Sequence, residues 1–130
     1  MIRTDNSLGK STEDYLKQIL LLQNEKGFVR SIELAVCFGY SRASVCNAVK
    51  NLTKKQLVIM GDDKTIYLTE DGRKIAERVY NKYRVIYSYL TDCLNVDTKI
   101  AAKDACKMEH IVSDFTCTCL SVMHDEAVYS

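Results

Sequence analysis

Apolar residues recur at helical spacing over most of this chain, and polar caps and glycines mark where helices begin and end. The first such stretch runs from Ser11 to Gly27. Ser11 followed by Asp14 resembles a capping box, with Asp in place of the usual Glu or Gln. Gly27 is expected to end the helix, because glycine adopts the left-handed conformation of a helix C-terminus without strain. The pattern predicts one helix with Asp14 in its first turn.

Two shorter helical stretches follow. Ser31 is expected to cap the first of them, and Ser41 is expected to cap the second, which runs to about Gln56. The turn between them contains Gly39. The second stretch leaves one face to polar and basic side chains, namely Arg42, Ser44, Asn47, Lys50, Asn51 and Lys54. Two helices joined by a glycine-containing turn, the second polar and basic on its outer face, indicate a helix-turn-helix.

The next segment predicts a β-hairpin. Leu57–Met60 and Thr65–Leu68 are rich in β-forming residues, and Gly61–Lys64 between them is typical of a turn. Thr69 then caps the following helix. A hairpin directly after a recognition helix is the wing of a winged helix-turn-helix, and this order of elements is more specific than any single one of them.

The second half of the chain is predicted to be helical throughout. A long helix is expected from Glu70 to about Leu94, too long to be buried fully against the winged domain. Asp97 is expected to cap a further helix that continues through Ile111. A last short helix begins at Ser113 and is followed by a frayed end. We expect this half to pair with another chain.

Together these elements predict a mainly α fold with two domains. Residues 1–72 form a winged helix-turn-helix DNA-binding domain, and residues 73–130 form an all-helical domain. The chain has no proline and few glycines, which favours continuous helices with short connections.

Composition narrows the class of protein. The chain has 130 residues, of which 27% are charged and 47% hydrophobic, as in soluble globular proteins. It contains no apolar run long enough to span a membrane, and its first residues lack the apolar core of a signal peptide. We therefore expect a cytoplasmic protein without a membrane partner. The six cysteines are then expected to be thiols or metal ligands rather than disulfides.

The net charge of +1 does not by itself indicate a nucleic-acid partner, but the charges are unevenly placed. Between Leu34 and Met60 every charged residue is basic. For a DNA-binding chain, the expected phosphate contacts are Arg30, Lys50, Lys54 and Lys64, and the expected base contacts are Ser41, Arg42, Ser44 and Asn47. The alternative for these residues is an ordinary solvated helix face.

A second candidate site lies at Cys106, Glu109 and His110. On a helix these positions share one face, and sulfur, oxygen and nitrogen donors together suit a transition-metal ion of intermediate softness. The alternative is an amphipathic helix with a buried cysteine and solvated Glu and His. A cysteine nucleophile with a histidine base is a third possibility, but without oxyanion donors or a glycine-rich loop we expect neither an enzyme nor a small organic substrate.

Three segments resemble one known family. Thr12–Leu16, Leu68–Arg73 and Asp104–His110, together with the winged helix between them, are similar to the metal-dependent repressors of the diphtheria-toxin-repressor and manganese-transport-regulator family. The resemblance runs from about Thr12 to Leu120. It implies a homodimeric repressor that reads a palindromic operator in double-stranded DNA. In this family divalent metal binds where the first helix meets the dimerisation helices.

The resemblance also implies a ligand set. Cys106, Glu109 and His110 match the ligands of the iron-responsive branch, whereas Asp14 matches an aspartate of the manganese-responsive branch. A thiolate favours Fe(II), Co(II) or Zn(II), and two carboxylates favour Mn(II). We therefore expect Fe(II) first, Mn(II) next, and Co(II) or Zn(II) as further candidates.

Several positions depart from the family pattern. Lys17 stands where the manganese branch has a second carboxylate on the first helix, and Tyr83 stands where both branches have a histidine ligand. Tyr87 and Ala102 replace ligands of the ancillary site of the iron branch. These changes favour a single mononuclear site, and the chain length argues against an SH3-like domain. They also leave an alternative, a winged-helix regulator that dimerises but has lost metal sensing.

Overall fold

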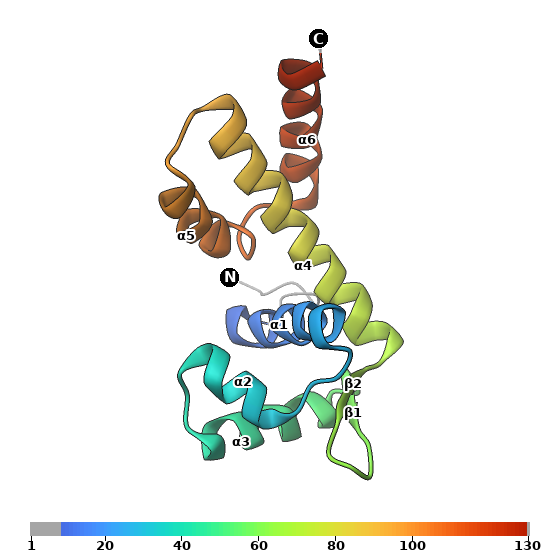
Figure 1. Cartoon of the computed structure of the whole chain (residues 1–130). Coiled ribbons are helices and arrows are strands. Elements are labelled where there is room, and N and C mark those ends of the chain that lie inside the picture. Colours follow the sequence, from blue (N-terminus) through green and yellow to red (C-terminus); the bar gives the residue numbers. More distant parts are fainter. Residues whose placement is uncertain (1–8, 130) are drawn as a thin grey trace. The chain divides into compact units, whose positions relative to one another are not determined.

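The structure is a computed structural model that describes residues 9–129. Figure 1 shows its elements in chain order. They are α1 (Lys10–Lys26), α2 (Ser31–Phe38), α3 (Arg42–Lys54), β1 (Val58–Met60), β2 (Ile66–Leu68), α4 (Glu70–Ser88), the π-helical turn η1 (Tyr89–Cys93), α5 (Thr98–Met108) and α6 (Asp114–Tyr129). This order confirms the predicted mainly α fold with a winged helix-turn-helix followed by helices.

The chain divides into two compact units. Unit 1 ends at Glu77 and unit 2 begins at Arg78, so the division falls inside α4. This division lies somewhat later in the chain than the expected domain boundary at residue 72.

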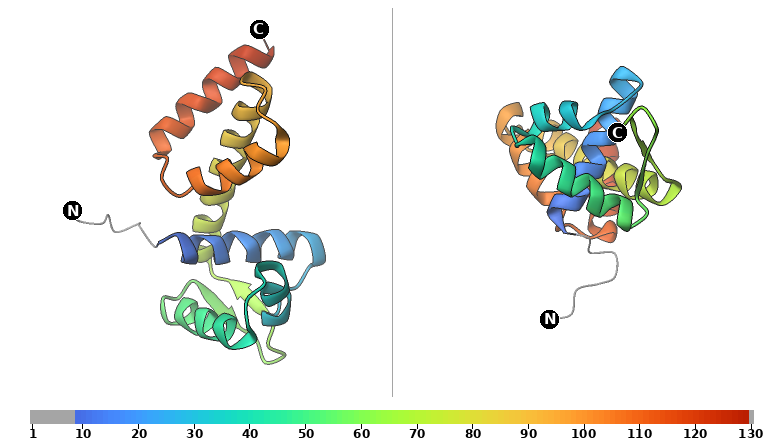
Figure 2. Two further views of the ribbon diagram at one scale, coloured as in Figure 1. Left: turned by 90° about the vertical axis from the view of Figure 1, so that its left-hand side faces the viewer. Right: turned by 90° about the horizontal axis from the view of Figure 1, so that it is seen from below.

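Unit 1 is built around the apolar face of α1. Figure 2 shows α1 lying across the pair α2 and α3, with the hairpin beside them. Its core consists mainly of aliphatic side chains from all of these elements, including Leu16, Ile19, Leu34, Val45, Val49, Leu52, Val58 and Ile66. The apolar residues that recur at helical spacing in the sequence thus lie on the buried face of each helix.

Two predicted N-caps of unit 1 are confirmed. The Ser41 hydroxyl accepts a hydrogen bond from the Ser44 backbone N–H at 3.1 Å at the start of α3. The Thr69 hydroxyl likewise accepts one from the Gly72 N–H at 3.0 Å at the start of α4. Such caps stabilise a helix because the first N–H groups have no partner within the helix.

Two other predicted caps are wrong. α1 begins at Lys10 and follows Gly9, whose carbonyl accepts from the Glu13 N–H at 3.2 Å. Ser11 therefore lies inside the helix, and Asp14 falls in its second turn. α2 begins at Ser31 itself, and the N-cap position belongs to Arg30. There the Arg30 N–H donates to Glu33 Oε1 at 2.7 Å, an interaction that local sequence preferences for serine caps did not indicate.

The wing is a two-stranded antiparallel hairpin. β1 pairs with β2 in the register Val58 with Leu68, Ile59 with Tyr67 and Met60 with Ile66. Alternation of side chains buries Val58 and Ile66 and leaves Ile59 and Tyr67 exposed. The turn is fixed by Asp63, whose Oδ1 accepts from the Thr65 N–H at 3.0 Å. This hydrogen bond holds the pKa of the Asp63 carboxyl below its ordinary value.

Gly72 lets α4 closely approach the backbone at Leu57, directly before β1. A Cβ atom at Gly72 would overlap the Leu57 carbonyl oxygen, and a backbone atom has little freedom to move. Gly72→Ala is therefore expected to lower the free energy of unfolding by about 3 kcal/mol. Urea unfolding measures this, with Gly39→Ala as the control. At Gly39 an added Cβ meets nothing within 4 Å, so only its positive φ costs about 1 kcal/mol. Equal losses for both variants would contradict the close approach.

Unit 2 consists of the rest of α4, η1, α5 and α6. α5 and α6 both pack against η1 (Figure 1). The Asp97 cap of α5 is confirmed, because its Oδ2 accepts from the Lys99 N–H at 3.1 Å. Two helix ends differ from expectation. α5 ends at Met108 rather than continuing through Ile111, and α6 extends to Tyr129 where a frayed end was expected.

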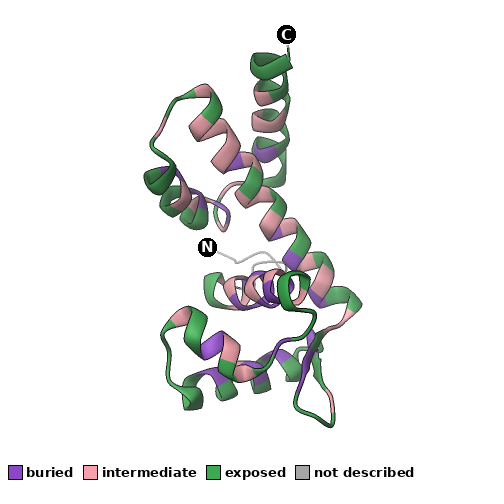
Figure 3. Cartoon of the chain, viewed as in Figure 1, coloured by how far each residue is buried: buried purple, intermediate pink, exposed green. Residues whose placement is uncertain are grey.

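Exposure differs between helices in unit 2. Figure 3 colours most of α6 as exposed.

Among the residues that the structure describes, no helix is both long and apolar enough to cross a membrane.

Candidate metal centre and nucleic-acid interface

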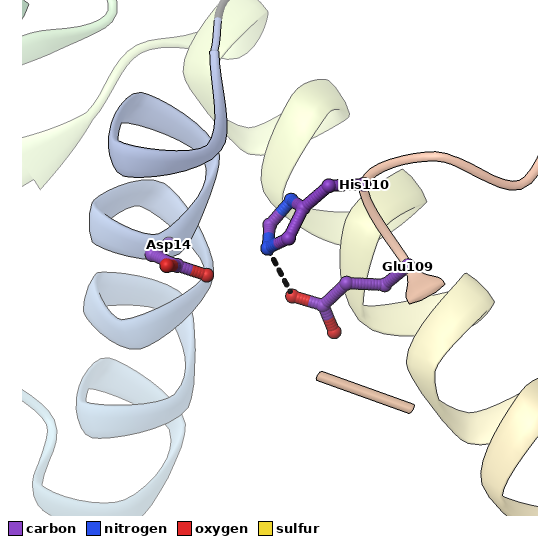
Figure 4. Close-up of side chains that lie close together, drawn as sticks. All are labelled: Asp14, Glu109 and His110. Carbon is purple, nitrogen blue, oxygen red and sulfur yellow. Dashed lines mark ion pairs between the residues drawn. The ribbon is translucent and has the colours of Figure 1, made fainter. Parts of the chain in front are cut away.

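The structure brings Glu109 and His110 together just after α5. His110 Nε2 lies 3.1 Å from Glu109 Oε2, and the two side chains are 6% and 0% exposed, respectively. Figure 4 shows the imidazole and the carboxylate turned toward each other. The backbone places them there because the Glu109 N–H still bonds to the Ala105 carbonyl, while the chain turns at Met108 to Val112.

This donor pair fits a divalent cation. A buried carboxylate is costly unless a cation or hydrogen-bond donors compensate its charge. Imidazole nitrogen and carboxylate oxygen are also the donors that Fe(II), Mn(II), Co(II) and Zn(II) share. Glu109 is almost fully buried with a second donor beside it, so this part of the chain has the chemistry that a metal site needs.

The other two expected ligands lie on the helices where the sequence placed them. Cys106 is on the last turn of α5, and its residue is exposed. Asp14 is on α1 and is half-buried; it belongs to unit 1, whereas the Glu109–His110 pair belongs to unit 2. Membership of Cys106 and Asp14 in one ligand set therefore stays a prediction.

A stack of three tyrosines runs along α4 and includes Tyr83 and Tyr87, the two tyrosines that the family resemblance places at ligand positions. The ring centroids of Tyr80 and Tyr83 are 6.3 Å apart, and those of Tyr83 and Tyr87 are 5.9 Å apart, with nearly parallel planes. Offset aromatic stacking at such distances stabilises a helix surface. Tyr83 and Tyr87 are thus used in packing along α4.

The predicted DNA contacts all lie on the surface of unit 1. Each is exposed: Arg30, Ser41, Arg42, Ser44, Asn47, Lys50, Lys54 and Lys64. The Ser41 and Ser44 hydroxyls also bond to each other at 3.0 Å, which fixes both at the N-terminus of α3. Lys64 lies at the hairpin turn with a φ of 66°. The arrangement presents polar and basic groups along α3, at the start of α2 and on the wing.

Four of these residues line one groove of about 510 Å³ between the start of α2, the outer face of α3 and the wing. They are Arg30, Arg42, Lys50 and Lys64, and among the described residues that line the groove every charged one is basic. Because four cationic side chains line this groove, the groove attracts a polyanion such as a nucleic-acid backbone.

Sequence reasoning missed the apolar part of this groove. Ile32 and Met60 also line it, and they are 45% and 42% exposed. Met60 was expected only as part of a strand, and Ile32 was not singled out. The missing information was the position of the wing relative to α2, which depends on contacts far apart in the sequence.

The two halves of the chain match two family profiles. One, described as "Iron dependent repressor, N-terminal DNA binding domain", matches residues 7–66. The other, described as "Iron dependent repressor, metal binding and dimerisation domain", matches residues 69–127. The groove thus lies in the first match and the Glu109–His110 pair in the second.

Individual relatives give the same picture. The chain is 33% identical over 108 residues to the HTH-type transcriptional regulator MJ0568 of Methanocaldococcus jannaschii, covering 82% of this chain and 86% of that protein. It is 30% identical over 104 residues to the diphtheria toxin repressor of Corynebacterium diphtheriae, covering 80% of this chain and 46% of that protein. The solved structure of the manganese regulator SloR matches with a TM-score of 0.76 and 29% identity, covering 86% of this chain and 52% of that one.

The chain spans about half the length of two of these three relatives. Over the part that it shares with them, it has both of the domains that the profiles describe. The chain therefore belongs to the iron-dependent repressor family, a family of DNA-binding transcriptional repressors and not of enzymes.

Proposed function

We propose that this chain is a metal-responsive repressor of metal-uptake genes, in which divalent metal favours the DNA-competent homodimer. The observation that supports the proposal most is the buried Glu109–His110 pair, because a carboxylate and an imidazole suited to a cation lie in the segment that matches a metal-binding and dimerisation domain. A chain that acts on chromosomal DNA would work in the cytoplasm, as its sequence predicts.

The proposed ligands are Asp14, Cys106, Glu109 and His110. They supply two carboxylate oxygens, one thiolate and one imidazole nitrogen, which suits a four-coordinate ion or a five- or six-coordinate ion with added water. Fe(II) is the favoured metal and Mn(II) the next, with Co(II) and Zn(II) as alternatives. Because raw affinities follow the Irving–Williams order, the metal levels in the cell contribute to which ion is bound.

The proposed switch joins the two units. Asp14 lies on α1 of unit 1, and the other three ligands lie in or just after α5 of unit 2. One ion bound by both sets restrains the DNA-binding unit relative to the dimerisation unit. If the restrained form binds DNA better, metal shifts the population toward it, and DNA must in turn tighten metal binding.

The proposed DNA contacts divide by type. Arg30, Lys50, Lys54 and Lys64 bind phosphates, which gives affinity that falls with salt. Ser41, Arg42, Ser44 and Asn47 lie where α3 meets base edges in the major groove, with Arg suited to guanine and Asn to adenine. A homodimer would read a palindromic operator with half-sites about one helical turn apart.

Exposed apolar residues in unit 2 support the proposed homodimer. They include Ile100 on α5, Ile111 after it, and Phe115, Val122 and Tyr129 on α6. Phe115, Val122 and Tyr129 recur every seventh residue, so they form one stripe along α6. Exposed apolar side chains in a row are typical of a surface that another subunit covers.

A second candidate function is a regulator that dimerises and binds DNA without metal. The observation that favours it is the stack of Tyr80, Tyr83 and Tyr87. In this stack Tyr83 and Tyr87, which stand where the family resemblance places ligands, are used for packing. The two functions differ in whether operator binding depends on metal.

The test is a gel shift with and without a chelator. Duplexes are first selected from random DNA with the full chain in the presence of Mn(II), and elemental analysis of the purified protein gives its metal content. The proposal expects a shift that chelation weakens and that added metal restores, while sedimentation shows the dimer intact. Equal shifts under both conditions would support the metal-independent regulator instead.

Thiolate ligation by Cys106 is tested with Co(II). A Co(II)–thiolate bond gives a charge-transfer band in the near ultraviolet, which oxygen and nitrogen ligands do not. The wild-type chain is expected to show this band at one equivalent of Co(II), and Cys106→Ser is expected to lose it. Cys119→Ser is the matched control, because Cys119 is also an exposed thiol in unit 2. A band that persists in Cys106→Ser would exclude Cys106 as a ligand.

A further inference from the structure

α6 is held in unit 2 by little apolar contact. Of its 16 residues, all of which the structure describes, only Cys117 is buried. Burial raises the pKa of this thiol, so it stays uncharged and acts as a small apolar side chain. With so little apolar area removed from water, the position of α6 depends on its polar contacts.

Polar contacts hold α6 at two points along its length. At its start, Lys82 Nζ lies 3.0 Å from Asp114 Oδ1 and donates to the Val112 carbonyl at 2.7 Å. Farther along, His124 Nε2 lies 2.7 Å from Asp92 Oδ2 of η1. His124 lies ten positions after Asp114, so the contacts are about 15 Å apart along the helix. The His124 contact therefore serves the C-terminal half of α6.

Both ring nitrogens of His124 face carboxylates. Besides Nε2 at Asp92, its Nδ1 lies 3.6 Å from Asp125 Oδ1 of α6 itself. A neutral imidazole has one N–H, so one of its nitrogens would turn a lone pair toward a carboxylate. The imidazolium presents an N–H to each. The geometry therefore fits the charged form of a side chain that is 17% exposed.

A further charged neighbour comes from α4. Arg84 lines a small cavity with His124, but its guanidinium is engaged elsewhere. Its Nη2 donates to Asn81 Oδ1 at 3.3 Å, and its Cζ lies 5.2 Å from the centre of the Tyr80 ring. The two carboxylates thus outweigh this cation, and the hydrogen bond to Asp92 raises the pKa of His124 above its ordinary value of 6.5.

We propose that the His124 imidazolium is a pH-dependent clip that holds the C-terminal half of α6 against the π-helical turn η1. A group whose pKa is raised by folding stabilises the folded form fully below its ordinary pKa. That stabilisation is lost as the pH rises through the raised value. The contact between α6 and η1 is therefore expected to weaken as the pH rises from 6.5 through the raised pKa of His124.

The clip is tested by NMR and by hydrogen exchange on the full chain. The His124 ring is expected to titrate above 6.5, and Asp92→Asn is expected to return it close to that ordinary value. Asp125→Asn removes the more distant carboxylate and is expected to have a smaller effect. A His124 ring that titrates at or below its ordinary pKa in the wild-type chain would overturn the proposal.

Hydrogen exchange follows the helix itself. Protection factors of amides in the second half of α6 are expected to fall as the pH rises through the titration of His124. In His124→Gln they are expected to be low throughout this range of pH, while amides near Asp114 keep their protection because the Lys82 contact remains. The same pH dependence in wild type and His124→Gln would overturn the clip.

Assembly gives a separate readout, which rests on the proposed function. Val122 and Tyr129 lie on the clipped half of α6, so the dimer is expected to weaken as the pH rises. Sedimentation equilibrium measures this for wild type and His124→Gln. If α6 loses protection and the dimer constant does not change, the clip stands and the stripe on α6 is not the subunit contact.

Discussion

Replacing Glu109 by Gln is expected to weaken binding of Mn(II) or Fe(II) by more than about a hundredfold and so to abolish metal-dependent operator binding. The substitution keeps the size of the side chain and one acceptor oxygen but removes its negative charge. Because Glu109 is 1% exposed, solvent cannot compensate for the lost negative charge. Burying a neutral amide is less costly than burying a carboxylate, so the apo chain is expected to stay folded.

Isothermal titration of the apo protein with Mn(II) under anaerobic conditions measures the loss. Asp104→Asn is the matched control, since Asp104 is an exposed carboxylate on α5 outside the proposed ligand set. The control is expected to bind metal as the wild type does, and thermal unfolding of both apo variants checks the fold. Wild-type affinity in a folded Glu109→Gln variant would remove Glu109 from the site.

Replacing Lys50 by Glu is expected to weaken operator binding by about tenfold to a hundredfold. Lys50 is exposed and lines the groove in which Arg30, Arg42 and Lys64 also lie. The substitution removes one phosphate-binding cation from each subunit and puts an acid among the remaining cations. Metal affinity in the absence of DNA is expected to stay unchanged, because Lys50 lies outside the proposed ligand set.

Fluorescence anisotropy over a range of salt concentrations measures this effect. The slope of log affinity against log salt is expected to fall by about one for each phosphate that the variant no longer binds. Lys99→Glu makes the same charge change at the exposed start of α5 and is the matched control. If the affinity falls equally in both variants, the net charge of the chain matters and the groove does not.

Local signals in the sequence were enough for much of the fold. Ser41, Thr69 and Asp97 cap their helices as predicted, because a capping hydrogen bond joins residues two or three apart. The hairpin was likewise predicted from two β-like stretches around Gly61–Lys64. The winged fold was then predicted from the order of these elements.

Some helix ends were predicted less well. Gly9 takes the position that Ser11 was expected to hold, and α5 ends at Met108 in a turn. η1 was not predicted, because a π-helical turn such as Leu94 N–H to Tyr89 carbonyl has no local sequence signal. α6 continues to Tyr129 although few of its residues are buried.

The candidate sites, too, could be predicted only in part from the sequence. Cys106, Glu109 and His110 could be found from their spacing, but the spacing did not show that Glu109 is buried and Cys106 is exposed. The basic residues of α3 were visible as a run without acids. Their convergence with Arg30 and Lys64 on one groove depends on how the wing packs. Asp14 entered only through the family resemblance, since its local sequence is that of an ordinary helix carboxylate.

The most direct test of metal-linked DNA binding is a closed linkage cycle with one selected operator duplex. Operator affinity is measured with and without Mn(II), and Mn(II) affinity is measured with and without the operator. Because coupling between two sites is reciprocal, both ratios are expected to be the same number and greater than one, about tenfold or more. An operator affinity that metal does not change, with a Mn(II) affinity that the operator does not change, would contradict metal-dependent repression by this chain.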